Sequence, residues 1–350
     1  MRAAIYDEYG GPEVLRVGEV EKPTPGEGEV LVRVRAVALN HLDIWVRRGL
    51  PIELELPHIG GSDIAGEVAE LGPGVEERVG GESWLEVGAP VVIDPSLGCG
   101  TCEWCLAGET SLCADYKIIG EHVRGGLAEY VVVPAENLYP IPEGYPFEKA
   151  AAAPLTFLTA WRGLISRGRL QAGEDVLVTG ASGGVSTAAI QIAKLAGARV
   201  FAVTTTENVE RVRDLGADVV YDRNEVDFSR EVWKDTGKRG VDLILDSVGS
   251  ATWKGNIRAL TKGGRLVVYG ATTGAIAETD LRLVFWKQAE IIGTTMSNRR
   301  EFETVMTLVF RGQLRPVVDL VWPLDRIREA HERIEAGEQF GKVVLEIGGQ

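Results

Sequence analysis

The pattern of apolar and polar positions changes character near residue 150. Before that point, short apolar runs alternate with polar residues and are broken by Gly and Pro, as in EVLVRVRAVAL, APVVIDP and AEYVVVP. Runs of this kind are typical of half-buried β-strands separated by turns. Residues 1–150 are therefore predicted to form a mostly β domain.

From residue 151 onward, an apolar run is repeatedly followed by a helical pattern. EDVLVTG precedes STAAIQIAKLAG, RVFAVT precedes NVERVRDLGA, DLILDSVG precedes TWKGNIRALTKGG, and RLVVYG follows. Strands that alternate with helices form βαβ units, whose strands are parallel. Residues 151–295 are therefore predicted to form an α/β domain with a doubly wound parallel sheet.

The remaining segment, residues 296–350, contains too few elements to bury a core alone. It reads as a helix (REFETVMTLVFRGQ), an extended piece (LRPVVDLVWPL), a second helix (DRIREAHERIEAG) and a final strand (KVVLEI). Because a short segment buries little apolar surface by itself, we expect these residues to return to the first domain.

Composition and charge narrow the class of partner. The 350 residues are 45% hydrophobic and 25% charged, which is typical of a soluble protein with two ordinary domains. The net charge of −14 argues against nucleic acid or an anionic membrane as a partner, since both repel such a surface. A small-molecule substrate is the expected partner. The start of the chain lacks the features of a signal peptide, and no apolar run approaches the length of a membrane span.

All the cysteines of the chain fall in one short window. They are Cys99, Cys102, Cys105 and Cys113. Four thiolates at this spacing close a tetrahedral Zn²⁺ shell and leave no position for substrate, so one structural zinc per chain is predicted. Reduced cysteines held by metal are typical of a cytoplasmic protein.

Two other interpretations of the cysteines remain open. Two disulfides, or four buried thiols, would need no metal, but disulfides between cysteines three residues apart strain the loop. An iron–sulfur cluster is the other alternative, because C-x2-C-x2-C opens the ferredoxin pattern. Here the fourth cysteine comes late and no proline follows it.

A glycine-rich turn follows the first predicted strand of the α/β domain. The turn GASGGVS, residues 180–186, comes directly after the strand at 175–179 and opens a helix. Glycines there let the backbone approach a pyrophosphate, whose charge rests on the free N–H groups of the helix. A tight turn without a ligand is the alternative. The residues expected to contact a dinucleotide are Ala181, Ser182, Gly183, Gly184 and Val185.

The second strand of this domain bears on the choice between NADP and NAD. An acid at its end would grip the ribose 2′-hydroxyl of NAD, but this strand ends in threonines, with no acid before Glu207. The absence of a carboxylate permits a 2′-phosphate, to which Thr205, Asn208 and Arg211 are placed to donate. NADP is therefore favoured, with NAD left open. Capping of the next helix is an alternative role for the threonines.

Taken together, these features resemble the medium-chain dehydrogenase/reductase superfamily of zinc-type alcohol dehydrogenase-like proteins, over essentially the whole chain. The similarity is closest to the quinone oxidoreductase-like branch, through NHLD at 40–43, the segment PHIGGSDIAG at 57–66, and the turn ASGGVS. This resemblance implies a GroES-like catalytic domain at 1–150 with a zinc lobe at 99–113. It also implies a Rossmann domain at 151–295, inserted before the returning segment at 296–350, and a homodimer or homotetramer formed through the edge of the nucleotide sheet.

The resemblance also bears on a second metal. Alcohol dehydrogenases of this family hold a catalytic zinc through a Cys, the His and sometimes the Glu of a G-H-E motif, and a later Cys or Asp. This chain has Asn40 at the first position, Ser62 and Asp63 in the motif, and Leu155 near the last. One carboxylate does not hold zinc without further ligands. We therefore expect an active site without metal.

The resemblance implies individual coenzyme contacts as well. His41 and Lys342 match positions where a cation meets the pyrophosphate, and Thr159 matches the residue beside the nicotinamide ring. Tyr221 matches a tyrosine that lies by the 2′-phosphate in the quinone reductase branch. The loop ends that flank the coenzyme match Gly249, Gly270 and Ala271.

Without a metal, the acceptor itself must delocalise the charge that hydride transfer creates, so a quinone or an α,β-unsaturated carbonyl is expected. Asn40 is the candidate donor to the substrate oxygen, Asp43 and Arg47 are a candidate orienting pair, and Asp63 is a candidate proton relay. Helix capping by Asn40 and a solvated Asp43–Arg47 pair are the alternatives. Trp45 and Trp286 are candidates for the wall of an apolar pocket, or for core or interface positions.

Three functions follow from these expectations. The first is an NAD(P)H-dependent reductase of quinones or enones, with acyl-CoA thioesters left open as acceptors. The second is an alcohol or aldehyde dehydrogenase of the same superfamily. The third is a nucleotide-binding protein with little turnover.

Overall fold

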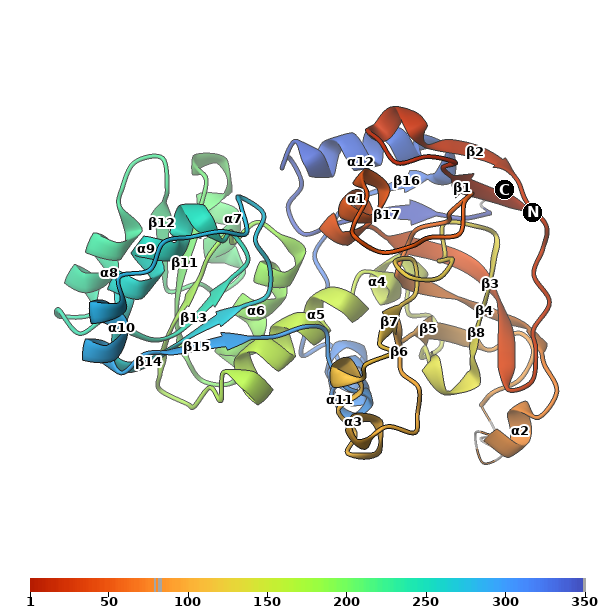
Figure 1. Ribbon diagram of the computed structural model, residues 1–350, viewed down its shortest axis with the longest axis horizontal. Helices are drawn as coiled ribbons and strands as arrows, with labels where there is room; N and C mark the ends of the chain where they lie inside the picture. The colour runs from red at the N-terminus through yellow and green to blue at the C-terminus, as the bar shows by residue number, and fades with distance from the viewer. Residues whose placement is uncertain (79, 81–83, 349–350) are drawn as a thin grey trace. The chain divides into compact units, whose positions relative to one another are not determined.

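The computed structural model describes residues 1–78, 80 and 84–348 (Figure 1). The chain divides into two compact units. Unit 1 contains Met1–Leu155, Asn298–Arg311 and Pro316–Gln350, and unit 2 contains Thr156–Ser297 and Gly312–Arg315. The residues after 298 thus belong mostly to the unit that the first 155 residues build.

Unit 1 is built on a seven-stranded sheet with the order β16-β17-β3-β4-β5-β9, in which β8 also pairs with β3. Its strands are β3 (Glu29–Ala38), β4 (Asp63–Leu71), β5 (Pro90–Ile93), β8 (Tyr130–Pro134), β9 (Leu138–Pro140), β16 (Val318–Pro323) and β17 (Lys342–Glu346). Two small sheets pair β1 (Arg2–Ile5) with β2 (Arg16–Glu19), and β6 (Ser96–Leu97) with β7 (Lys117–Ile118).

The register of this sheet brings three distant chain segments together. Ala38, at the end of β3, pairs with Asp63 at the start of β4. Ala38 also pairs with Val344 in the middle of β17, so the blue C-terminal strand lies against β3 in Figure 1 and Lys342 at its start lies beside the residues after β3. The residues just after β3, at the start of β4 and at the start of β17 therefore meet.

The helices of unit 1 are short and cover a core formed by the strands. They are α1 (His41–Arg48), α2 (Val75–Arg78), α3 (Glu103–Leu106), α4 (Phe147–Ala151), α11 (Arg299–Phe310) and α12 (Ile327–Glu335). The core contains fully buried valines of β3 and β4 such as Val30 and Val68, and α12 adds Ile327 and Ile334. The returning C-terminal segment is thus part of the core.

Unit 2 contains a six-stranded parallel sheet with the order β12-β11-β10-β13-β14-β15. The strands are β10 (Asp175–Val178), β11 (Arg199–Thr204), β12 (Val219–Asp222), β13 (Val241–Asp246), β14 (Leu260–Val268) and β15 (Glu290–Gly293). Numbered within the unit, the order is 3-2-1-4-5-6, so the direction of winding reverses between β10 and β13. The predicted doubly wound Rossmann sheet is confirmed.

The helices of unit 2 connect these strands. They are α6 (Gly184–Leu195), α7 (Val209–Asp214), α8 (Phe228–Asp235), α9 (Ser250–Ala259) and α10 (Leu281–Lys287), while α5 (Pro154–Trp161) leads into the unit. The central strands are apolar on both faces, with Leu177, Phe201 and Ile244 fully buried. Burial on both faces is expected for a parallel sheet covered by helices.

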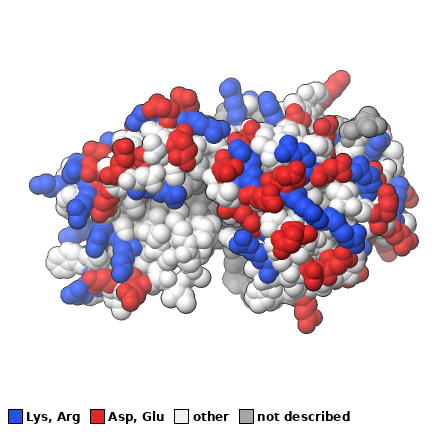
Figure 2. Space-filling view, turned by 90° about the horizontal axis from the view of Figure 1, so that it is seen from above, with Lys and Arg blue, Asp and Glu red and all other residues white. Residues whose placement is uncertain are grey.

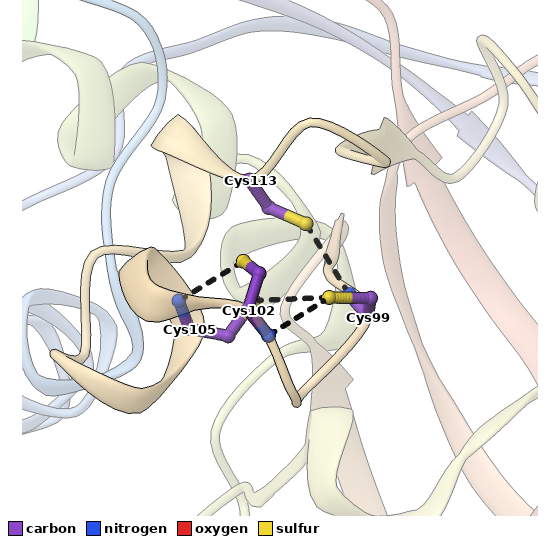
Figure 3. Close-up of side chains that lie close together, drawn as sticks. All are labelled: Cys99, Cys102, Cys105 and Cys113. Carbon is purple, nitrogen blue, oxygen red and sulfur yellow. Dashed lines mark hydrogen bonds between the residues drawn. The ribbon is translucent and has the colours of Figure 1, made fainter.

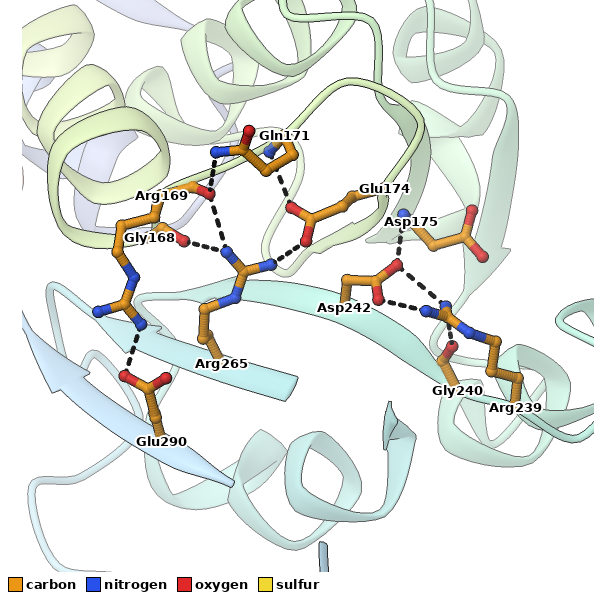
Figure 4. A network of polar contacts seen from close by, with 10 residues as sticks. All are labelled: Gly168, Arg169, Gln171, Glu174, Asp175, Arg239, Gly240, Asp242, Arg265 and Glu290. Atoms are coloured by element: carbon orange, nitrogen blue, oxygen red, sulfur yellow. Dashed lines mark hydrogen bonds and ion pairs between the residues drawn. The ribbon is translucent and has the colours of Figure 1, made fainter. Parts of the chain in front are cut away.

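A polar network joins the amino ends of the central strands in unit 2 (Figure 4). Arg265 of β14 donates to the carbonyl oxygens of Gly168 and Arg169 at 2.6 and 2.9 Å, and it forms an ion pair with Glu174. A second pair, Arg239 with Asp242, lies beside the backbone N–H of Asp175, which donates to the same carboxylate at 2.9 Å. These contacts tie the segment before β10 to β13 and β14.

The surface carries charges of both signs. Acidic and basic side chains are interspersed on the face that Figure 2 presents, although acidic groups are in excess in the sequence. Within the described residues, no helix combines the length and the apolar character that crossing a membrane requires.

The Arg265 network predicts a large stability effect. Arg265→Met leaves two carbonyl oxygens and the Glu174 carboxylate without their cation, so the free energy of unfolding should fall by about 2 to 4 kcal/mol. Urea unfolding measures this change. Lys254→Met is the matched control, because Lys254 is exposed and lies 3.5 Å from Glu278, and its cost should stay below about 0.5 kcal/mol. Equal costs for the two variants would contradict the assignment.

Candidate functional site

A buried polar cluster occupies the point in unit 1 where β3, β4 and β17 meet. Asn40 follows β3 and caps α1, and its backbone N–H donates to Asp43 Oδ2 at 2.7 Å. The other carboxylate oxygen of Asp43 accepts from the N–H of Gly61 at 2.8 Å. Asp43 therefore fixes the start of α1 against the loop that precedes β4.

Lys342, at the start of β17, joins this cluster. Its Nζ donates to Asn40 Oδ1 at 2.5 Å and to Asp63 Oδ2 at 2.8 Å. Asp63 Oδ2 also accepts from Asn40 Nδ2 at 3.0 Å, and Asp63 Oδ1 accepts from the backbone N–H of Leu155 at 2.7 Å. Each of the three side chains is less than 10% exposed. The cluster is a closed triangle of one ammonium, one carboxylate and one amide.

The triangle fixes the orientation of the Asn40 amide. Because an ammonium only donates, Oδ1 must face Lys342, and Nδ2 then faces Asp63 and the carbonyl of Ala38, 3.4 Å away. Both hydrogens of Nδ2 are therefore engaged inside the protein. Asn40 occupies the N-cap position of α1, where Asp43 accepts from its backbone N–H, but its side chain is directed to Lys342, Asp63 and Ala38.

Two carboxyl groups near this cluster have raised pKa values. Burial raises the pKa of Asp43 to about 6, although its two backbone donors and Lys342 act in the opposite direction. Burial also raises the pKa of Glu121 to about 7, and the Asp43 charge adds to that increase. Carboxyl groups that titrate near neutrality are suited to proton transfer.

The expected pairing of Asp43 with Arg47 is wrong. The fully buried Arg47 side chain forms an ion pair with Glu335, contacts His331 Nδ1 at 3.2 Å, and donates to the carbonyl of Gly10 at 3.2 Å. The Arg47 side chain therefore joins α1 to α12, because it is long enough to reach acceptors on α12 instead of pairing with Asp43 on its own helix. Burial and the Arg47 charge lower the pKa of His331 to about 3, so this histidine is neutral.

His41 and Trp45 lie one turn apart on α1, with ring centroids 6.2 Å apart. Desolvation of the imidazole and the charge of Lys342 lower the pKa of His41, although the residue is exposed. Trp45 is 36% exposed, which places it at the surface of α1.

In unit 2, the glycine-rich turn lies between β10 and α6, at the reversal point of the sheet. Gly180 has a positive φ of 57°, and Gly183 precedes α6 without a side-chain cap. The first N–H groups of α6 therefore remain available to an anion. Ser182, Gly183, Gly184 and Val185 are half-buried and Ala181 is buried. This geometry fits the pyrophosphate of a dinucleotide.

Asp246, at the end of β13, organises the neighbouring loop. It accepts hydrogen bonds from Thr179, Thr252 and the N–H of Gly249, at 2.6, 2.7 and 2.9 Å. Gly249 has a φ of 85°, and a Cβ there would lie 2.9 Å from Ala271 Cα. Only glycine fits this approach of two loops, which supports the expected positions of Gly249, Gly270 and Ala271 at the carboxyl edge.

At the end of β11, the groups expected to meet a 2′-phosphate make hydrogen bonds within the protein. Thr205 Oγ1 donates to Glu207 at 2.5 Å and accepts from Asn208 at 3.2 Å, so these groups already bind one another. The Tyr221 hydroxyl donates to Asp235 at 2.8 Å, and its ring stacks on Phe201 in the core. Tyr221 is 5% exposed because its strand is covered by α8.

The two other candidate residues of this unit, Thr159 and Trp286, differ in exposure. Thr159 is buried on α5. Trp286 is 68% exposed on α10, with the ammonium of Lys262 5.2 Å from its ring centroid. Trp286 is therefore a surface residue and does not line an enclosed pocket.

The four cysteines meet in the lobe around α3 (Figure 3). Their ligand atoms all lie within 4.8 Å of one another. Backbone N–H groups of Cys99, Cys102 and Cys105 donate to the sulfurs of Cys113, Cys99 and Cys102 at 3.5, 3.3 and 3.5 Å. Such donors stabilise thiolates, and the cysteines form no disulfide. The lobe fits one metal ion with four sulfur ligands.

Two family models match the chain in the order of its two units. The alcohol dehydrogenase GroES-like domain matches residues 26–143, and the zinc-binding dehydrogenase domain matches residues 184–311. The human quinone oxidoreductase is 31% identical over 99% of this chain and 97% of its own length. This chain belongs to the medium-chain dehydrogenase/reductase superfamily. It is a zinc-type alcohol dehydrogenase-like member and an NAD(P)-dependent oxidoreductase.

Other members of the superfamily carry different names. An acryloyl-coenzyme A reductase of Sulfurisphaera tokodaii is 32% identical over 96% of this chain and 97% of its own length. A crystal structure of an NAD-dependent alcohol dehydrogenase is 45% identical, covers 99% of this chain and 100% of its own, and has a TM-score of 0.94. These relatives share the superfamily and the fold with this chain, but their names indicate different substrates.

Sequence reasoning missed several groups that the structure places beside the predicted ones. The backbone N–H of Leu155 donates to Asp63, 92 residues earlier, and the charge of Asp43 acts on Glu121. Asp246 had a local signal, because it ends a buried strand three residues before Gly249. Glu121 had none, and Leu155 was considered only for its place near a metal ligand of the family.

The raised pKa of Glu121 predicts a pH-dependent stability difference. Its folded pKa of about 7 exceeds the ordinary value of 4.5, so between these values the folded state binds more protons than the unfolded state. This group therefore lowers the free energy of unfolding as pH rises. Glu121→Gln should gain about 1 to 3 kcal/mol relative to the native protein between about pH 4.5 and pH 8. Urea unfolding at both values tests this, with the exposed Glu143→Gln as a control expected to show no such trend.

Proposed function

We propose that this protein is an NAD(P)H-dependent reductase of quinones or α,β-unsaturated carbonyls that works without a catalytic metal and carries one structural zinc. The observation that supports the metal-free acceptor site is the Lys342–Asn40–Asp63 triangle. An ammonium lies against the carboxylate and the amide oxygen that would otherwise be metal donors. Among the described residues, the lobe cysteines form the one group of three or more His, Cys, Asp or Glu side chains placed to hold a metal.

The residues of unit 2 supply the coenzyme site of this proposal. The N-terminus of α6 and residues 181–185 would hold the pyrophosphate, and Gly249, Gly270 and Ala271 border the bound coenzyme. When bound, NAD(P)H supplies a hydride. The sequence favours NADP, because β11 does not end in an acidic residue. However, Glu207 accepts a hydrogen bond from Thr205, and its negative charge would disfavour a 2′-phosphate there. A comparison of NADPH with NADH tests this preference.

The residues of the unit 1 cluster would serve the acceptor. Asp43 holds the backbone of Asn40 and Gly61, which fixes the cluster rigidly. Asp63, which accepts from Lys342, Asn40 and Leu155, is the proposed relay for the proton that completes reduction. A conjugated acceptor delocalises the negative charge that it gains, so it needs less electrostatic stabilisation from the protein than an isolated carbonyl.

Reduction of an aldehyde, or oxidation of an alcohol, is the second candidate. The observation that favours it is the 45% identity to the NAD-dependent alcohol dehydrogenase structure, which exceeds the 31% identity to the human quinone oxidoreductase.

The full-length protein tests these alternatives directly. Metal content is measured, and oxidation of NADPH and NADH is followed with 1,4-benzoquinone, a cyclic enone, an acyl-CoA enoyl thioester and an aldehyde. The expected result is about one zinc per chain and turnover of the quinone or an enone acceptor. Cys113→Ser should lose the zinc, whereas Thr101→Val, which removes only a hydroxyl 3.6 Å from Cys99 Sγ, should keep it.

Other results of this experiment would contradict the proposal. Two tightly bound metal ions per chain together with faster alcohol oxidation would favour the second candidate. Tight NADPH or NADH binding without turnover would indicate a nucleotide-binding protein instead. Zinc retained by Cys113→Ser would exclude the lobe as the metal site.

We also propose that the protein is a cytoplasmic homodimer or homotetramer. The reduced cysteines support the compartment. The outer strand β15 has no neighbour on one side among the described strands, and around it Leu281, Phe285, Trp286 and Ile291 are between 46% and 71% exposed. An open strand edge beside apolar side chains favours pairing with a second copy. Light scattering should give the mass of two or four chains, and the mass of one chain would contradict this assignment.

A further inference from the structure

The family resemblance assigns Lys342 to the coenzyme pyrophosphate, and in the structure its ammonium is buried against Asn40 and Asp63. Its residue is 3% exposed, and its partner Asp63 is fully buried. The charge of Lys342 acts on its surroundings, since it lowers the pKa of both His41 and Asp43. A positive charge that is largely shielded from water acts strongly on a neighbouring group, because the local dielectric constant is low.

Lys342 differs from Asn40 in how many of its hydrogen-bond donors are already used. Both hydrogens of Asn40 Nδ2 face Asp63 and the carbonyl of Ala38, and the backbone N–H of Asn40 is held by Asp43. The ammonium of Lys342 has three hydrogens, of which two face acceptors among the described residues. The third is therefore the charged donor that the cluster still offers.

The neutral donor beside the cluster, the Ser62 hydroxyl, would form a weaker hydrogen bond than Lys342. The hydroxyl of Ser62 is buried and has no hydrogen-bond partner in the described part of the chain, so it is a second free donor beside Asp63. A hydrogen bond from an ammonium to a developing oxyanion is roughly twice as strong as one from a neutral hydroxyl. Ser62 is therefore better suited to orient the acceptor than to stabilise its charge.

We propose that Lys342 is the electrophilic catalytic residue, whose third N–H binds the acceptor oxygen while Asn40 and Asp63 hold the ammonium in place. This inference rests on the proposed function. When bound, NAD(P)H would supply a hydride to the acceptor carbon, and the π electrons of the acceptor would move to its oxygen. Lys342 would hold the negative charge there, and Asp63 would pass on a proton from water that completes the reduction.

The test compares Lys342→Met, Lys342→Arg and the native protein under saturating coenzyme. Lys342→Met keeps the length of the side chain and removes its charge, so kcat for the enone should fall about 100-fold or more. The KM for NAD(P)H should stay within about 3-fold, because this role concerns the acceptor and not coenzyme binding. Lys342→Arg should recover at least about a tenth of the native kcat, since it restores a cation.

Two controls separate catalysis from folding. Lys287→Met removes a half-buried ammonium that donates to the carbonyl oxygens of Arg258 and Leu260 in unit 2, and its kcat should equal that of the native protein. If Lys342→Met unfolds because Asp63 is left as an unpaired buried charge, the double variant Lys342→Met/Asp63→Asn removes that charge. It should fold, bind NAD(P)H by fluorescence quenching, and have a kcat well below that of Asp63→Asn alone, which removes the proposed proton relay but keeps the ammonium.

The outcomes distinguish this inference from the function on which it rests. Native protein that turns over none of the acceptors overturns both. Native protein that reduces the enone, with Lys342→Met within 2-fold of its kcat, overturns only the role of Lys342. A raised KM for NAD(P)H with unchanged kcat would assign Lys342 to the coenzyme pyrophosphate instead and would also overturn the inference.

Discussion

The buried ion pair between Lys342 and Asp63 is the contact on which the arrangement of unit 1 depends. It joins the first residue of β17 to the first residue of β4, and Asn40 extends it to the end of β3. A buried ion pair is retained only when further hydrogen bonds satisfy its charges. Here Asn40 and the N–H of Leu155 provide them. The same contacts that close the sheet therefore also orient Lys342, Asp63 and Asn40 in the candidate acceptor site.

In unit 2, the stabilising polar network and the proposed coenzyme site lie at opposite ends of the strands of one parallel sheet. At the amino ends of the strands, Arg265 and Glu174 close loops against one another and leave no carbonyl of Gly168 or Arg169 free. At the carboxyl ends, the first N–H groups of α6 are uncapped and Asp246 positions the Gly249 loop. Ligands bind at this edge in doubly wound sheets because helix N-termini converge there.

Much of the fold was predictable from local sequence. The change of pattern near residue 150 separates β-hairpin geometry from βαβ geometry, and each pattern has its own period of apolar residues. The turn at 180–186 and the cysteine window were equally predictable, because their function depends on residues close together in the chain. The side chain of Tyr221 was not, since its partner Asp235 is on the following helix and only the packing of α8 brings them together.

The sequence by itself determined which chemistry is present: four sulfur ligands in one loop, a glycine-rich turn after a buried strand, and the replacement of soft metal ligands by Asn40, Ser62 and Asp63. The tertiary structure alone decided how those groups are used. It paired Arg47 with Glu335 instead of Asp43, and it brought Lys342 to Asn40 across 302 residues. Local spacing fixes turns and chelate loops, whereas the partner of a long charged side chain is set by strand register and helix packing.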